Sequence, residues 1–150
     1  MKYELEKKLA DDFPFMRRKK DLREQSESGM IDDLYGAFGC ECEDGWFDLL
    51  YGLCSEITEV YKRYGAAADI VVEQIKEKYG ELRFYYGYEA ASENHSNLYR
   101  EVNEIIRKYE ESSSRVCEKC GKPGITREEL PWIWTLCDDC LAQMQAGKEC

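Results

Sequence analysis

Two pairs of cysteines carry the strongest chemical signal in this chain of 150 residues. Cys117 and Cys120 form one Cys-x-x-Cys pair, and Cys137 and Cys140 form a second pair after a spacer of sixteen residues. Four thiolates at this spacing can surround a zinc ion tetrahedrally, because each pair presents two sulfurs from one tight turn. A closed four-thiolate site has no open position for water, so we expect one structural Zn²⁺. Catalytic zinc, iron, a redox pair and disulfides are the alternatives.

Three further cysteines lie closer to the start of the chain. Cys40, Cys42 and Cys54 could form a second metal site together with His95 or Cys150. Nothing in the spacing fixes a fourth ligand. The simpler expectation is that Cys54 packs on the apolar stripe of a helix and that the other two are loop thiols.

The segment KYGELRFYY (78–86) is rich in aromatic residues and contains one arginine. Strand alternation assigns Leu82, Phe84 and Tyr86 to a core face and leaves Arg83 and Tyr85 on the opposite face. Aromatic rings stack on bases for about 1–3 kcal/mol per base, and arginine binds phosphate through a bidentate fork. The candidate ligand-binding residues are Lys76, Lys78, Tyr79, Arg83, Tyr85 and Trp46, with Trp132 and Trp134 as possible further walls.

Apolar periodicity places these residues on a small set of elements. Helices are expected over 3–12, 46–64 and 97–111, and a β-hairpin over 70–88 with its turn at 78–81. The order of elements predicts an α+β fold, in which a small helix–β-hairpin–helix core carries a C-terminal zinc ribbon with four cysteine ligands.

Local signals set the expected boundaries of these elements. Asp44 and Ser96 are suitable N-caps, and Gly65 is a suitable helix stop. The serine-rich stretch at 112–115 suggests a linker between a core at 1–114, best defined over 30–114, and a zinc ribbon at 115–150.

Composition excludes several function classes. The net charge is −10 and the pI about 4.7, so binding to extended nucleic acid is disfavoured. The N-terminal stretch is charged and lacks the apolar region of a signal peptide, and no stretch is apolar enough to span a membrane, which predicts a soluble, cytoplasmic protein. The chain has one histidine and no common catalytic motif, so we expect a non-enzymatic function.

Three segments together resemble small uncharacterised accessory proteins of tailed bacteriophages and prophages. They are the DGWFDL segment with its flanking cysteines (42–54), KEKYGELRFYY (76–86) and CxxCGKPG…TLCxxC (117–140). The resemblance covers about residues 40 to 140. It implies a phage accessory role in the host cytoplasm, for example in counter-defence, and assigns no activity to any residue.

Two binding functions follow from these observations. The first is capture of a nucleotide-type signalling ligand by the aromatic and cationic residues of the hairpin. The alternative is a protein-binding inhibitor or adaptor that blocks a host protein through its acidic, aromatic surface and zinc ribbon. A third possibility is that the hairpin residues only stabilise the fold.

Overall fold

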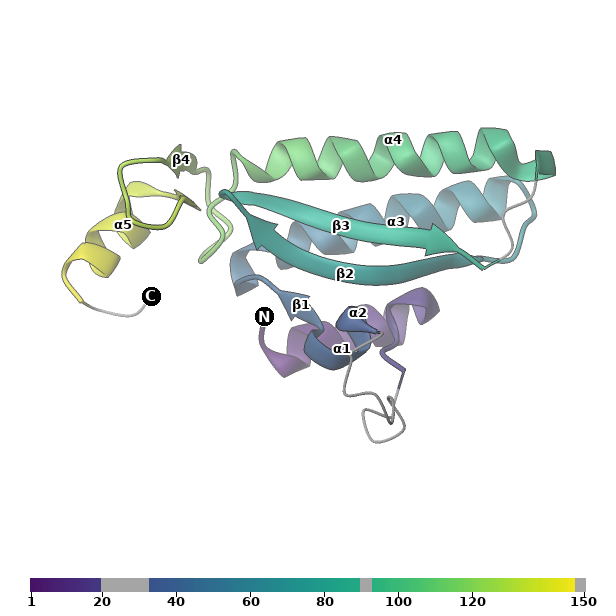
Figure 1. The fold of residues 1–150 in the computed structure, drawn as a ribbon, viewed down its shortest axis with the longest axis horizontal. Coiled ribbons are helices and arrows are strands. Elements are labelled where there is room, and N and C mark those ends of the chain that lie inside the picture. The colour runs from purple at the N-terminus through teal and green to yellow at the C-terminus, as the bar shows by residue number, and fades with distance from the viewer. Residues whose placement is uncertain (20–32, 90–92, 148–150) are drawn as a thin grey trace.

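The computed structural model describes residues 1–19, 33–89 and 93–147. In Figure 1, helices α3 and α4 lie on one side of a sheet, while α1 and α2 lie beside its β1 edge. Helix α5 lies beyond the end of the sheet at which β2 finishes and β3 begins. The elements are α1 (Tyr3–Asp12), η1 (Pro14–Met16), α2 (Leu34–Phe38), β1 (Cys40–Glu41), η2 (Asp44–Trp46), α3 (Phe47–Arg63), β2 (Ile70–Lys78), β3 (Glu81–Tyr88), η3 (Glu93–His95), α4 (Ser96–Ser113), β4 (Ile125–Arg127), β5 (Trp134–Leu136) and α5 (Asp138–Gln145). This is mixed helix and sheet, as the α+β prediction requires.

The predicted β-hairpin is confirmed, with a two-residue turn. Strands β2 and β3 pair antiparallel, and Tyr79 and Gly80 connect them with positive φ values of 54° and 78°. Two positive φ values match the twist of the flanking strands, which explains the tight connection. A register shift between Val72 and Gln74 bulges β2 at Glu73.

The hairpin is part of a larger sheet that the sequence patterns did not predict. β1 pairs parallel with β2, so that Cys40 lies opposite Ile75 and Glu41 opposite Lys76. The strand order is β1-β2-β3. Cys40 is therefore a strand residue and not a loop thiol, whereas Cys42 follows the strand in a bend, and both are buried.

The core lies between the sheet and the helices. Leu82 and Phe84 are buried on the side of α3 and α4, as alternation predicts, and Tyr86 is half-buried there. Tyr86 donates a hydrogen bond to Asn103 of α4, 2.8 Å away. β2 adds Ile75, and the helices contribute most of the other large buried side chains of this core, which include Trp46, Leu50, Leu53, Ile57, Leu98, Val102 and Ile106.

Both predicted N-caps are wrong, although the helices themselves form. The Asp44 carboxylate accepts a hydrogen bond from the backbone N–H of Lys2 at 2.7 Å, and α3 begins after the short turn η2. α4 begins at Ser96 itself, and no side-chain cap is present there. Gly65 does follow α3 with a left-handed φ of 61°, as expected of a helix stop.

The first half of the serine-rich stretch is helix and the second half is a turn, so the stretch is not an open linker. Ser112 and Ser113 form the last turn of α4, and Ser113 is fully buried. Its hydroxyl accepts a hydrogen bond from the N–H of Leu82 at 2.8 Å and donates one to the carbonyl of Glu110. A division of the chain at residue 114 remains a prediction.

Candidate metal centre and surrounding surfaces

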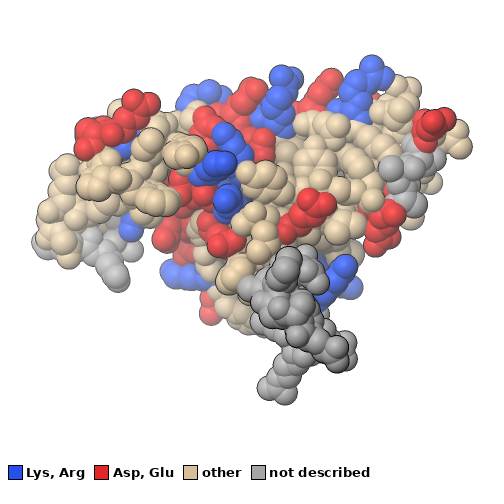
Figure 2. Space-filling view, viewed as in Figure 1, with Lys and Arg blue, Asp and Glu red and all other residues tan. Residues whose placement is uncertain are grey.

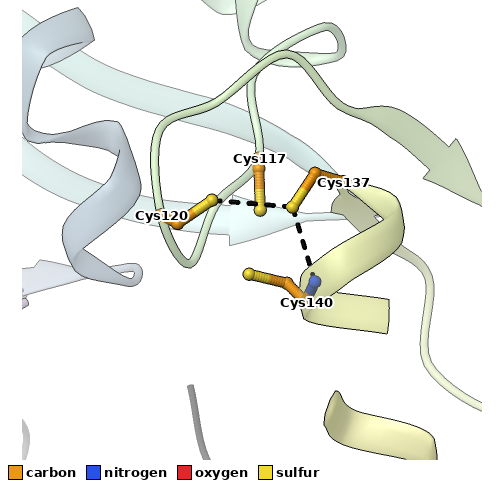
Figure 3. A group of neighbouring side chains, drawn as sticks. All are labelled: Cys117, Cys120, Cys137 and Cys140. Carbon is orange, nitrogen blue, oxygen red and sulfur yellow. Dashed lines mark hydrogen bonds between the residues drawn. The ribbon is translucent and has the colours of Figure 1, made fainter. Parts of the chain in front are cut away.

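The four predicted metal ligands converge. Cys117 and Cys120 lie on one loop, and Cys137 and Cys140 lie at the start of α5, with all four side chains pointing into one small space (Figure 3). Their sulfur atoms all lie within 4.8 Å of one another, and Cys120 Sγ is 3.6 Å from Cys137 Sγ. Tetrahedral zinc with Zn–S bonds of about 2.3 Å needs sulfurs about 3.8 Å apart. The donor set and its dimensions therefore fit a four-thiolate metal site.

The backbone holds each cysteine pair in a tight turn. The N–H of Gly121 donates to the carbonyl of Cys117, and the N–H of Cys117 donates to the carbonyl of Lys122, both at 2.8 Å. Gly121 has a φ of 77°, which glycine adopts without strain. In the second pair, the N–H of Cys140 lies 3.4 Å from the sulfur of Cys137, the N-cap of α5. Backbone hydrogen bonds thus give both turns a shape in which the two sulfurs of each pair lie on the same side.

The electrostatic surroundings favour a thiolate at Cys137. Burial alone would raise the pKa of this thiol, but the N–H of Cys140 and the neighbouring thiols lower the pKa to about 7. At Cys120, burial and the hydrogen bonds to Cys117 and Cys137 raise the pKa. A divalent cation would deprotonate all four, so its affinity is expected to increase with pH.

The other cysteines lie apart from this centre. Cys40, Cys42 and Cys54 are buried in the main core, and burial raises the pKa of each thiol, to about 12 for Cys40. In residues 1–19, 33–89 and 93–147, the quartet is the one group of His, Cys, Asp or Glu side chains suited to a metal ion. Cys150 lies outside the described residues.

Most of the candidate ligand residues lie on the side of the sheet opposite to α3 and α4. Lys76 lies directly across from Arg83, and Tyr85 is the next outward-facing residue along β3. The face carries basic side chains near the turn of the hairpin, with acidic side chains around them (Figure 2). One of these acids is Glu81, whose carboxylate lies 2.7 Å from the Arg83 guanidinium. The face is thus already partly neutralised.

Lys78 lies at the turn end of this face, across from Glu81, and the other two candidate residues lie elsewhere. Lys78 ends β2 beside the turn, and its ammonium lies 5.8 Å from the ring centroid of Tyr79. Tyr79 occupies the turn and is 70% exposed. Trp46 lies in the core with no exposed surface, and its indole N–H donates to the carbonyl of Val116 at 2.9 Å. Trp46 is therefore not placed to contact a ligand at the surface.

Two exposed aromatic residues flank the contact between the hairpin turn and the cysteine segment. Trp132 is 62% exposed and donates its indole N–H to Glu77 at 2.9 Å, and Tyr79 lies in the turn itself. We call Tyr79 and Trp132 the junction surface. Ile125 is also exposed, but it lies on the face of β4 opposite to Thr126, the residue that contacts Gly80. Both aromatic residues were predicted from the sequence, Tyr79 as a candidate ligand contact and Trp132 as a possible further wall.

Glu118 was not among the residues that the sequence patterns singled out. It lies between the first two cysteines and is 2% exposed. One carboxylate oxygen accepts from the N–H of Glu43 at 3.2 Å, while the other has no hydrogen-bond partner among the described residues. Burial raises the pKa of this carboxyl to about 7. A glutamate in an acidic chain gives no sequence signal of burial, because charged residues are mostly exposed.

Comparison of the chain with known protein families, with curated proteins and with solved structures finds no match. Within the described residues, no helix combines the length and apolar character required to cross a membrane.

Proposed function

We propose that this chain is a non-enzymatic, zinc-stabilised binding protein that engages a partner protein through the junction surface. The observation that carries the proposal is the exposure of Tyr79 and Trp132 beside the contact between the hairpin and the cysteine segment. Exposed tyrosine and tryptophan are typical anchors of protein interfaces, because they bury a large area with little loss of side-chain entropy.

Zinc is the ion that the four thiolates favour, since they offer soft donors at tetrahedral separation and leave no position for water. Its role would be structural. Elemental analysis of the purified protein tests this: we expect about one zinc per chain in the wild type and a loss of zinc in Cys137→Ser. Absence of metal from freshly purified wild-type protein would refute the zinc proposal.

The scaffold suits a protein partner because the junction surface is held by contacts on both sides. The Thr135 hydroxyl donates to the carbonyl of Gly80 at 2.7 Å, and the Trp132 indole is oriented by Glu77. A surface that is ordered before binding loses less conformational entropy when the complex forms. If the resemblance to phage accessory proteins holds, the partner would be a host protein in the host cytoplasm.

A capture experiment with matched variants tests this proposal. The wild type, Trp132→Ala and the control Tyr64→Ala are immobilised and exposed to the same bacterial lysate, and retained proteins are quantified. Tyr64 is 41% exposed and lies at the C-terminal end of α3. We expect at least one protein that wild type and Tyr64→Ala retain and Trp132→Ala loses. The same retained set for all three would refute a role for the junction surface.

A second candidate function is supported by the register of the sheet. Lys76 and Arg83 lie opposite one another with Tyr85 nearby, which is a suitable arrangement for a phosphate beside a flat ring. A nucleotide-type ligand would have to displace Glu81 from Arg83. A melting screen against cyclic nucleotides and ADP-ribose-type compounds tests this, since a true ligand at about 100 times Kd stabilises by about 2.7 kcal/mol. A stabilisation that Arg83→Ala abolishes would support it, and no shift across the panel would refute it.

A further inference from the structure

Three segments that are far apart in the sequence meet at one place in the fold. They are the turn η2, the turn of the β2–β3 hairpin, and the segment that carries the four cysteines. We infer that metal binding at the cysteines locks η2 and the hairpin turn in place, so that the ion stabilises the main core as well as the short segment that binds it. This inference rests on the proposed zinc site and is independent of the partner.

The first contact places the loop of Cys117 directly against Gly45. The N–H of Gly45 donates to the carbonyl of Glu118 at 2.7 Å, and the N–H of Glu43 donates to the Glu118 carboxylate. A Cβ atom at position 45 would lie 2.3 Å from the carbonyl oxygen of Cys117 and 2.4 Å from that of Glu118. The obstacle is backbone, which cannot rotate away. Only glycine allows this approach, which gives a structural role to the glycine of the DGW segment.

The residue next to Gly45 adds a side-chain contact. The indole N–H of Trp46 donates to the carbonyl of Val116 at 2.9 Å, and the ring itself is fully buried in the main core. The carbonyl that it binds belongs to the residue before Cys117. The largest side chain of the core therefore depends on the position of the first ligand loop for its hydrogen bond.

The second contact joins the other cysteine pair to Gly80. Thr135 is fully buried, and its hydroxyl donates to the carbonyl of Gly80 at 2.7 Å. Thr135 precedes Cys137 by two residues, and its own carbonyl accepts from the N–H of Glu118 at 2.9 Å. Each ligand pair thus holds a different glycine of the main core, and Glu118 connects the two contacts.

The contacts require an ordered cysteine segment. That segment buries few apolar side chains apart from its cysteines, of which Leu136 is the largest, so it gains little free energy from its own core to offset the entropy of ordering. Metal binding supplies folding free energy to such segments. When the ion is removed, the carbonyls of Val116, Cys117 and Glu118 lose their fixed positions, and η2 and the hairpin turn lose their partners.

Nuclear magnetic resonance of the full ¹⁵N-labelled chain tests the coupling. Spectra are recorded with zinc and after chelation, and three signals are followed: the amides of Gly45 and Gly80 and the indole N–H of Trp46. We expect all three to shift or broaden on chelation together with the cysteine segment, and zinc to restore them. Unchanged signals at all three positions, with changes confined to residues 115–147, would overturn the inference.

Variants separate the coupling from metal binding itself. The zinc-dependent rise in melting temperature is measured for wild type, Gly45→Ala and the control Gly87→Ala, in which a Cβ would meet only the flexible Glu73 carboxylate at 2.8 Å. We expect Gly45→Ala to retain about one zinc while showing a smaller rise than wild type. The control should show the wild-type rise.

A third variant guards against loss of folding in Gly45→Ala. Thr135→Val keeps the shape of the side chain and removes the hydrogen bond to Gly80, and we expect it also to reduce the zinc-dependent rise. A wild-type rise in both Gly45→Ala and Thr135→Val would overturn the inference while leaving the zinc site intact. Absence of zinc from wild-type protein would instead overturn the zinc proposal and this inference together.

Discussion

Replacement of Ser113 by alanine should destabilise the protein far more than its position in the middle of a serine-rich stretch suggests. The hydroxyl is fully buried and accepts the backbone N–H of Leu82 at 2.8 Å, on the β3 edge of the sheet. Ser113→Ala would leave this buried N–H without a partner. An unsatisfied buried donor costs about 1–3 kcal/mol, and the better helix propensity of alanine returns at most about 0.5 kcal/mol.

The neighbouring serine provides a matched control. Ser112 occupies the same last turn of α4, and its hydroxyl donates only to the carbonyl of Lys108 within its own helix. Ser112→Ala thus shares the change in helix propensity but leaves the hydrogen bond between helix and strand in place. We expect its effect to remain within about 0.5 kcal/mol.

Urea denaturation of the metal-loaded protein measures the difference between the two variants. The midpoint should fall for Ser113→Ala with an unchanged m-value, because the same surface is exposed on unfolding. Hydrogen exchange at the Leu82 amide should also become faster. Equal midpoints for the two variants, or unchanged protection of Leu82, would refute the assignment of this serine as a structural link.

Three further predictions concern other buried polar groups and the hairpin turn. Burial raises the pKa of the Glu110 carboxyl above its ordinary value of 4.5, although the hydrogen bond from the N–H of Phe84 opposes this shift. Folding therefore favours the protonated carboxyl. The stability that the protonated carboxyl contributes is lost as the pH rises through the raised pKa. The stability of wild type relative to Glu110→Gln, measured by urea unfolding, should therefore fall as the pH rises from about 4.5 through the raised pKa, and a constant difference would contradict the assignment. Gly80→Ala should lower the unfolding free energy by about 1–3 kcal/mol, because φ is 78° at this position, and a neutral result in the same assay would contradict that reasoning. Tyr61→Phe removes a 2.7 Å hydrogen bond to the Asp69 carboxylate and should cost about 1.5–3 kcal/mol by thermal and urea unfolding, whereas an unchanged midpoint would show that the bond contributes nothing net.

Sequence patterns predicted correctly those structural features that are determined by residues close together in the chain. The range 3–12 was predicted for the first helix and is observed as α1, and the hairpin turn follows from the glycine at position 80 between two alternating segments. The cysteine quartet was identified from spacing alone, since two residues between ligands are what a tight turn requires. Within the helix, the turn and each cysteine pair, the residues that determine the structure lie only a few positions apart.

Sequence patterns failed where a distant segment determines the outcome. Asp44 has the properties of an N-cap, but its carboxylate accepts a hydrogen bond from the backbone N–H of Lys2 instead. Ser113 has the properties of a linker residue, but its hydroxyl accepts a hydrogen bond from the N–H of Leu82 at the edge of β3. Trp46 was a candidate ligand contact, but its indole N–H donates a hydrogen bond to the carbonyl of Val116 inside the core. In each case a partner at least 31 residues away in the sequence decides the role.

The outer edge of β3 has a further consequence for how the molecule behaves at high concentration. An uncovered strand edge is a template for another strand, and such edges promote intermolecular sheet formation. Here the N–H of Leu82 donates to the Ser113 hydroxyl and the N–H of Phe84 donates to the Glu110 carboxylate, each at 2.8 Å. Both acceptors are side chains of α4, so the helix protects this part of the edge as well as covering the core. The same two side chains that stabilise the fold thus also oppose self-association by strand pairing at this half of β3.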